Sequence, residues 1–205
     1  DNFGNPNDTN KDGSQSSPAV GNWGGFLFEP TSDPLSEITY SIIQYGKFNN
    51  YYGGEIVLLN ASPTISNCEI KNVKYGIAAH YSSQPQILNN DFANSEFTPV
   101  AISLSAAPVF SGNTLSKCGL TPLGLLGGEV GADGLISSRN IAGYENITYV
   151  IVGDITINSG TYIEVESGVN IKFTDDKKIT VNGGFNISGT DENPVIFSSV
   201  YDDNV

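Results

Sequence analysis

The residues best suited to bind an ion lie near the N-terminus, in Asp8-Thr9-Asn10-Lys11-Asp12-Gly13. Side-chain oxygens at alternate positions, here Asp8, Asn10 and Asp12, followed by a glycine for a sharp turn are typical of calcium loops. The glutamate that closes an EF-hand loop would fall at position 19, which is an alanine, so this is not an EF-hand. We expect Asp202 and Asp203, of the same copy or of a neighbouring one, to complete a Ca²⁺ site. The alternative is a surface turn that binds no ion.

The side chains that catalysis needs are scarce. His80 is the only histidine, so neither a histidine-based triad nor a site with several histidine ligands can be built. Polysaccharide lyases need basic groups beside a sugar acid, and Arg139 is the only arginine. Glycoside hydrolases need two carboxylates that face each other, whereas Asp175-Asp176 and Asp202-Asp203 are adjacent pairs whose side chains diverge at turns. We therefore predict no enzymatic activity, and we expect His80 to be exposed at the end of a strand.

Aromatic side chains offer a different chemistry, the stacking of sugar rings. Tyr51 and Tyr52 lie in an insertion between residues 49 and 54, and Tyr81 follows a predicted strand, so these three are candidate sugar ligands. The alternative is that aromatic residues mainly fill the core. That interpretation applies first to Trp23, Phe26, Phe28 and Tyr40.

The composition favours a folded chain of short strands. Only 15% of the 205 residues are charged, against about 25% in an average globular protein, while 39% are hydrophobic and 23 are glycine. The formal net charge is −13, with no basic cluster that would fit nucleic acid or an anionic membrane. No apolar run reaches the length of a membrane-spanning helix. Because no methionine is present, we expect a mature product, a fragment or one unit of a longer chain.

An internal repeat organises the chain. The segment that begins Pro63-Thr64-Ile65-Ser66-Asn67-Cys68 returns in altered form at Pro85 and at Pro108, offsets of 22 and 23 residues. Each copy alternates apolar and polar residues, as short strands do, with turn residues between. A period near 22 with three strands indicates one coil of a parallel β-helix, an all-β solenoid whose strands stack about 4.8 Å apart.

Equivalent positions in successive coils should form ladders along the axis. Cys68, Asn90 and Asn113 fall on one such position, where asparagine amides can hydrogen-bond to one another. The alternative is that they are merely turn asparagines. Because Cys68 and Asn113 are two coils apart, roughly 10 Å, a bridge from Cys68 to Cys118 exceeds the reach of a disulfide. We predict two free thiols, with Cys68 inside.

The period persists in the second half, where Ile157 and Val181 are 24 residues apart and Ile163 and Phe185 are 22 apart. We therefore expect one continuous unit over residues 1–205, with residues 1–20 as a projecting loop rich in Asp and Asn. Residues 119–147 lack clean alternation, and we expect an irregular coil or a loop there.

Several phrases resemble a recurring module of large bacterial surface proteins. They are Gly21-Asn22-Trp23-Gly24-Gly25-Phe26, Gly168-Val169-Asn170-Ile171-Lys172-Phe173, Pro194-Val195-Ile196-Phe197, and the aspartates at 8–12 and 202–203. This is a family of extracellular right-handed parallel β-helix repeat proteins, similar to the pectate-lyase solenoid without its enzyme residues. The resemblance implies the fold and a setting at the cell surface.

In that module the aspartate pair leads into the Asp/Asn loop, so residue 205 reads into residue 1 of a further copy. We therefore expect copies joined end to end, covalently or not, in a filament or adhesin, against the alternative of a fragment with frayed ends. The predicted function is a structural or adhesive unit of an extracellular fibre. The alternative is a carbohydrate-binding module.

Overall fold

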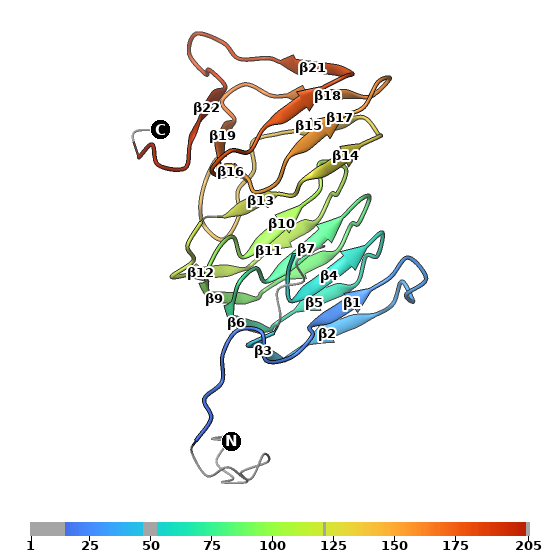
Figure 1. Ribbon diagram of the computed structural model, residues 1–205, viewed down its shortest axis with the longest axis vertical. Coiled ribbons are helices and arrows are strands. Elements are labelled where there is room, and N and C mark those ends of the chain that lie inside the picture. Colours follow the sequence, from blue (N-terminus) through green and yellow to red (C-terminus); the bar gives the residue numbers. More distant parts are fainter. Residues whose placement is uncertain (1–14, 47–52, 121, 204–205) are drawn as a thin grey trace.

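The computed structural model describes residues 15–46, 53–120 and 122–203, and these residues form 22 β-strands with no helix among them (Figure 1). Each strand has three to five residues, and every pair of named strands is parallel. The strands follow one another around an axis in about seven turns, which confirms the predicted parallel β-helix. No segment among the described residues is a helix long and apolar enough to cross a membrane.

One sheet, here called the long sheet, runs the whole length of the solenoid. It has eight strands, one from each successive coil. In order along the axis they are β1 (Phe26–Phe28), β4 (Ile56–Leu59), β7 (Ile77–His80), β10 (Val100–Ile102), β13 (Leu123–Leu125), β16 (Thr148–Ile151), β19 (Asn170–Phe173) and β22 (Ile196–Ser199).

The other two sides of the solenoid are each divided into two sheets. In the N-terminal half, one side contains β2 (Glu37–Thr39), β5 (Thr64–Ser66), β8 (Gln86–Leu88) and β11 (Val109–Ser111), and the other contains β3 (Ile42–Gln44), β6 (Glu69–Val73), β9 (Asp91–Ser95) and β12 (Thr114–Ser116). In the C-terminal half, one side contains β14 (Gly128–Val130), β17 (Ile155–Ile157) and β20 (Ile179–Val181), and the other contains β15 (Gly134–Ile136), β18 (Tyr162–Val165) and β21 (Gly184–Ile187).

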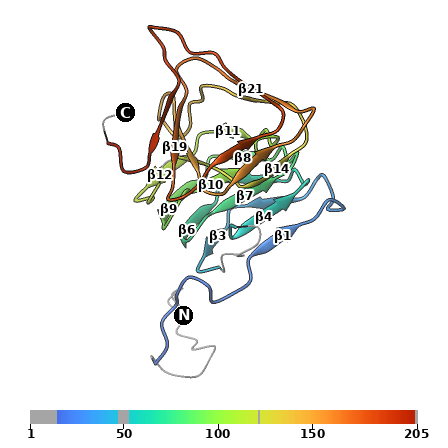
Figure 2. The ribbon, with the colours of Figure 1, turned by 45° about the horizontal axis from the view of Figure 1, so that its top comes forward.

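The fourth and fifth coils are therefore joined by strand pairing on one side only. Of their strands, only β10 and β13 in the long sheet are partners, while β11 and β12 have no strand beyond them and β14 and β15 have none before them. Figure 2, turned so that the C-terminal end comes forward, shows the coils of the C-terminal half stacked beyond those of the N-terminal half. The length of the connections contributes to this loss of pairing, because six residues separate β10 from β11 but only two separate β13 from β14. We call this level the sheet break.

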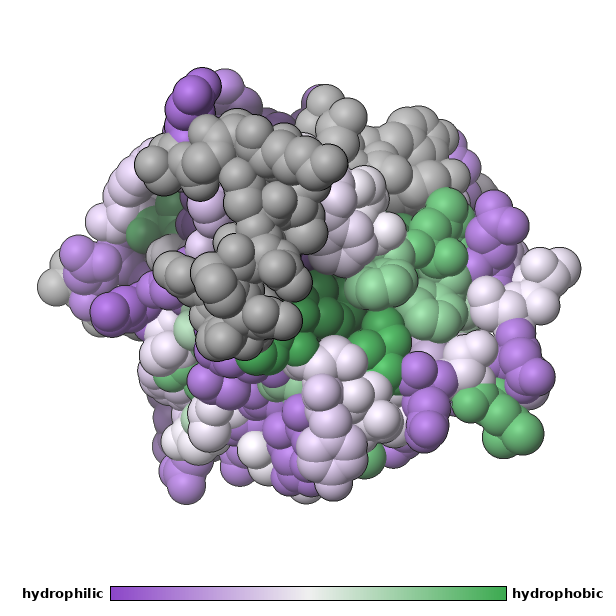
Figure 3. Space-filling model, turned by 90° about the horizontal axis from the view of Figure 1, so that it is seen from below, coloured by the Kyte–Doolittle hydropathy of each residue, from purple (hydrophilic) through white to green (hydrophobic). Residues whose placement is uncertain are grey.

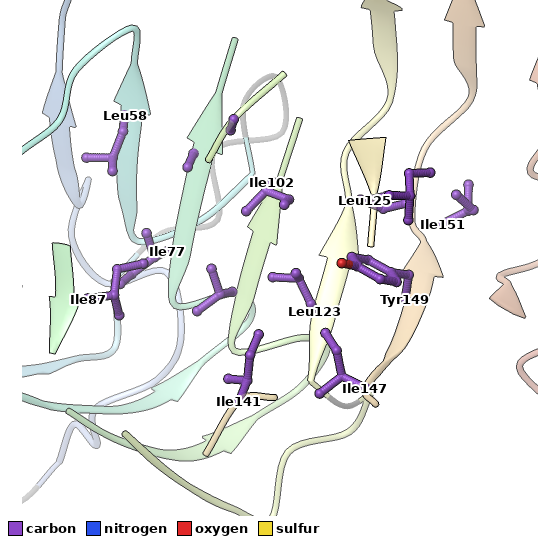
Figure 4. Packing of buried hydrophobic residues seen from close by; sticks show 14 of the residues in the cluster. Leu58, Ile77, Ile87, Ile102, Leu123, Leu125, Ile141, Ile147, Tyr149 and Ile151 are labelled. Atoms are coloured by element: carbon purple, nitrogen blue, oxygen red, sulfur yellow. The ribbon is translucent and has the colours of Figure 1, made fainter. Parts of the chain in front are cut away.

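Residues 119–147 contain the sheet break. Three short strands, β13 to β15, form there and pair with the next coil, and the irregular part follows them, from Ser137 to Ile147. Ile141 and Tyr144 form an isolated antiparallel bridge across a two-residue turn. Ile141 and Ile147 are buried in the core near Leu123 and Tyr149 (Figure 4). The excursion therefore contributes apolar side chains to the interior.

The strands are short runs rich in β-branched residues, and every second side chain along a strand points into the core. In the long sheet the inward row comprises Phe26, Ile56, Ile77, Val100, Leu123, Tyr149, Ile171 and Phe197, which are register partners from strand to strand. All six middle members are at most 3% exposed. Burying such a side chain stabilises the fold by roughly 1.5–3 kcal/mol, so this row is a major source of stability.

The turns of the N-terminal half confirm the predicted ladder. Two residues separate each strand pair β5–β6, β8–β9 and β11–β12, and the first of the two has a positive φ: Asn67, Asn89 and Gly112. The second residue points inward. The Asn90 side chain accepts a hydrogen bond from the Cys68 N–H at 3.0 Å and donates to Asn113 Oδ1 at 3.1 Å. Asparagine suits these turns because its amide can replace the missing strand hydrogen bonds.

Two further expectations can be compared with the structure. Both cysteines are free and Cys68 is buried, as predicted. The expectation that Trp23, Phe26 and Tyr40 fill the core was wrong: all three are exposed, Tyr40 to 84%. Tyr40 occupies the positive-φ turn position of the first coil and so points outward, while Trp23 and Phe26 belong to the first described coil, at the end of the solenoid. Of the four aromatic residues, only Phe28 packs against the core.

Candidate functional site

The predicted calcium ligands are only partly within the described residues. Asp8, Asn10 and Asp12 lie outside them. Asp202 is half-buried just after β22, where its carboxylate accepts a hydrogen bond from Ser198 Oγ at 2.5 Å and its carbonyl oxygen accepts one from Lys172 Nζ. Asp203 is exposed. Within residues 15–46, 53–120 and 122–203 no group of three His, Cys, Asp or Glu side chains is placed to hold a metal ion.

The second aspartate pair also lies at a turn. Asp175 and Asp176 are exposed between β19 and β20. Asp175 accepts a hydrogen bond from the Tyr201 hydroxyl at 3.0 Å, and this bond is the main reason that the pKa of Tyr201 is raised. The contact ties the turn after β22 to the turn of the coil before it. This hydrogen bond therefore has a structural role, holding the two turns together.

The aromatic candidates do not form a sugar-binding row within the described part. Tyr51 and Tyr52 lie outside it. Tyr81 is half exposed at the end of β7, with its ring 5.9 Å from that of His80. The other exposed tyrosines do not occupy equivalent positions in successive coils: Tyr40 follows β2, Tyr144 follows β15, Tyr162 begins β18 and Tyr201 follows β22.

The expectation that His80 is exposed was wrong. His80 is the last residue of β7, pairs in register with Leu59 of β4 and is only 8% exposed. Arg139, the other residue considered for catalysis, lies in the excursion after β15, and its Nε is buried without a hydrogen-bond partner among the described residues. Burial raises the pKa of Tyr149, and the positive charge of Arg139 opposes part of this shift. Arg139 is thus part of the packing around the excursion.

One buried carboxyl group was not singled out in the sequence. Glu55 directly precedes β4 and is 2% exposed, and its Oε1 accepts a hydrogen bond from the Gly46 N–H at 2.8 Å. Burial raises the pKa of Glu55 from 4.5 to about 7, and the bond from Gly46 opposes part of this shift. A side chain on Gly46 would collide with the Glu55 carboxylate, so a glycine is needed there. The only sequence signal was an acidic residue set between Gly54 and an apolar strand.

The most distinctive surfaces are the two ends of the solenoid. The inward row of the long sheet begins at Phe26 and finishes at Phe197, and these two are 42% and 39% exposed although their row is otherwise buried. Each packs edge-on or tilted against one further aromatic ring, Trp23 at 5.3 Å and Phe173 at 6.4 Å. Seen from its N-terminal end, the molecule has apolar residues across the middle and hydrophilic residues around much of the rim (Figure 3).

The strand edges at these two ends are open as well. β1 and β22 are the end strands of the long sheet, and among residues 15–46, 53–120 and 122–203 each has a partner strand on one side only. An unpaired edge next to exposed apolar side chains is a surface that can pair with another strand. Both ends therefore combine main-chain hydrogen-bonding groups with an apolar centre.

Comparison with known proteins gives the family. No curated protein and no solved structure matched the chain. A family model described as "Right handed beta helix region" matches residues 25–202, most of the chain and all seven coils. The chain belongs to this right-handed β-helix family.

Proposed function

We propose that the protein is a non-catalytic structural module of an extracellular fibre or large bacterial surface protein, in which copies stack end to end. The observation that carries the proposal is the inward row of the long sheet, which is buried throughout except at its two ends. A solenoid repeats the same strand pairing and apolar packing from coil to coil, so each end presents the strand edge and apolar side chains that are paired between coils in the interior. Stacking would make the row continuous.

The two ends fit each other in direction and in register. All strands of the long sheet are parallel, so the open edge of β22 in one copy can accept β1 of the next in the same orientation. Keeping inward residues inward sets Phe26 beside Phe197 and Leu27 beside Ser198. Removing two exposed phenylalanines from water would contribute on the order of 2–4 kcal/mol to each joint, since both are already half-buried.

Calcium belongs to the same proposal. Asp8, Asn10 and Asp12 have the spacing of a calcium loop, and Asp203 is exposed beside β22 at the C-terminal end. A Ca²⁺ ion shared by the loop of one copy and Asp202 and Asp203 of another would stiffen the joint. Asp202 would have to exchange its bond with Ser198 for the ion.

Electron microscopy of the purified chain, with and without a calcium chelator, tests the assembly. Filaments with an axial repeat near 38 Å, the eight strands of the long sheet at about 4.8 Å each, are expected. Fraying in chelator would place calcium at the joints. Isolated particles in both conditions would refute end-to-end stacking, and binding of glycans, with Tyr51 and Tyr52 as candidate ligands, would then be tested instead.

A pair of variants tests the role of the inward row. Phe26→Ser should shorten or abolish filaments because it removes the aromatic end of the row. Tyr144→Ser is the matched control, since Tyr144 is an aromatic residue of similar exposure at the side of the solenoid. Equal loss of filaments in both variants would show that the row is not the contact.

A further inference from the structure

Both ends of the solenoid carry the same sign of charge. In residues 15–46, the N-terminal end, the charged residues are Glu29, Asp33 and Glu37, all exposed, with no lysine or arginine. In residues 170–203, the C-terminal end, six acidic residues outnumber three lysines. The side chains of each of these two described ranges therefore carry a formal net charge of −3.

The lysines at the C-terminal end do not balance its acidic residues. Lys177 and Lys178 lie in the turn before β20, and Lys172 lies in β19, so all three belong to the last full coil, and the six acidic residues outnumber them. Lys172 already donates to the carbonyl oxygen of Asp202. The residues that follow β21 include Asp191, Glu192, Asp202 and Asp203 and no basic residue.

Distance determines when these charges interact. Within one molecule the ends are about 34 Å apart, more than three Debye lengths at 0.1 M salt, so they hardly affect each other. In a stack, the two acidic ends come within one or two coil spacings, roughly 5–10 Å. Resting on the proposed function, we infer that dissolved cations control end-to-end association by screening these acidic ends, so that low ionic strength opposes stacking and rising salt promotes it.

The direction of the salt effect distinguishes this device from an ordinary charged interface. Interfaces between opposite charges weaken as salt increases, because screening removes the attraction. Here screening removes a repulsion and leaves the apolar contact of Phe26 and Phe197, which moderate sodium chloride does not weaken. Two ends of charge −3 should make the association constant about three- to tenfold larger at 500 mM than at 20 mM sodium chloride.

Sedimentation velocity of the full chain at 20 and 500 mM sodium chloride tests the inference. A chelator is present throughout, so that any specific calcium effect is removed. The test variant is Glu29→Lys with Glu37→Lys, which changes the N-terminal end from −3 to +1. Its control is Glu96→Lys with Glu145→Lys, two exposed acidic residues in the third and fifth coils that give the same total charge. Circular dichroism confirms that both variants are folded.

The wild type and the control should associate more strongly at high salt, and the test variant should associate at low salt and lose or reverse the dependence. Association of the wild type that weakens with salt, no association at either salt, or the same response in both variants would overturn the inference. The proposed function is tested separately by filaments without chelator. Filaments whose assembly ignores salt would refute the screening alone, and the absence of filaments would refute the stacking itself.

Discussion

The asparagine ladder gives the sharpest prediction about stability. Asn90 is 1% exposed, and its amide makes three hydrogen bonds: from the Cys68 N–H at 3.0 Å, to the Ile65 carbonyl at 2.9 Å and to Asn113 Oδ1 at 3.1 Å. Asn90→Leu keeps a similar side-chain size but removes all three. The Asn113 oxygen keeps a bond from the Asn90 backbone N–H at 3.0 Å, whereas the Cys68 N–H loses its acceptor inside the solenoid.

The size of the effect follows from these bonds. A buried N–H without a partner costs about 1–3 kcal/mol, and each of the two other lost hydrogen bonds costs roughly 0.5–1.5 kcal/mol. Burial of the leucine side chain offsets part of this loss. We expect Asn90→Leu to lower the free energy of unfolding by about 3 kcal/mol, a large part of the total of a typical domain.

Urea unfolding followed by circular dichroism measures this change. Asn186→Leu is the control, because Asn186 is exposed in β21 and its amide bonds only to Ser188 Oγ in the described structure. The control should change stability by no more than about 0.5 kcal/mol. A loss below about 1 kcal/mol for Asn90→Leu, with an unchanged dependence on urea, would refute the conclusion that the ladder stabilises the N-terminal half.

Three further substitutions test individual contacts. Cys68→Asn should stabilise by about 1 kcal/mol in urea unfolding, because the Cys68 thiol lies 3.5 Å from the Ile38 carbonyl, where an amide can donate as Asn90 does one coil later; a lower midpoint would contradict this. Glu55→Gln should remove a pH dependence: the raised pKa makes the folded state bind more protons between pH 4.5 and about 7, so wild-type stability is full below pH 4.5 and falls as the pH rises through 7. At pH 8 the variant should be more stable by on the order of 1–3 kcal/mol, and equal midpoints at pH 4 and pH 8 in the wild type would disprove the assignment. Tyr40→Asn should stabilise the fold by about 0.5 kcal/mol and so raise the thermal midpoint slightly, because Tyr40 has a φ of 48° and asparagine tolerates this conformation better than tyrosine. A lower midpoint would show that the tyrosine ring contributes packing.

Much of the fold could be predicted because a solenoid repeats its local rules. The prolines at 63, 85 and 108 revealed the period, and the shared offset of Cys68, Asn90 and Asn113 located the ladder. The sheet break could not be predicted, since it depends on connection lengths that are meaningful only once each strand is in register. Burial of His80 was missed because alternation along β7 does not show that Leu59 of β4, in the preceding coil, lies beside it.

The candidate site was predicted less well, for a physical reason. Phe26 and Phe197 have the sequence pattern of core residues and do point inward, so only their position in the first and last strands of the sheet makes them exposed. The aspartates at 202 and 203 were placed correctly at a turn near the C-terminal end, but their chemistry depends on residues outside the described ranges. Burial of the Glu55 carboxyl group could not be predicted without knowing how the first two coils pack together.

The sheet break also has a consequence for how the molecule comes apart. In a solenoid, each coil is held by its neighbours, so cooperativity passes along the axis from one interface to the next. At the break that coupling is carried by a single pair of three-residue strands, β10 and β13, with apolar packing around the excursion. We therefore expect the protein to unfold as two cooperative blocks, of four and three coils, joined at the interface with the least strand pairing. Under tension or denaturant, the transition should begin there, and one block can open while the other remains folded.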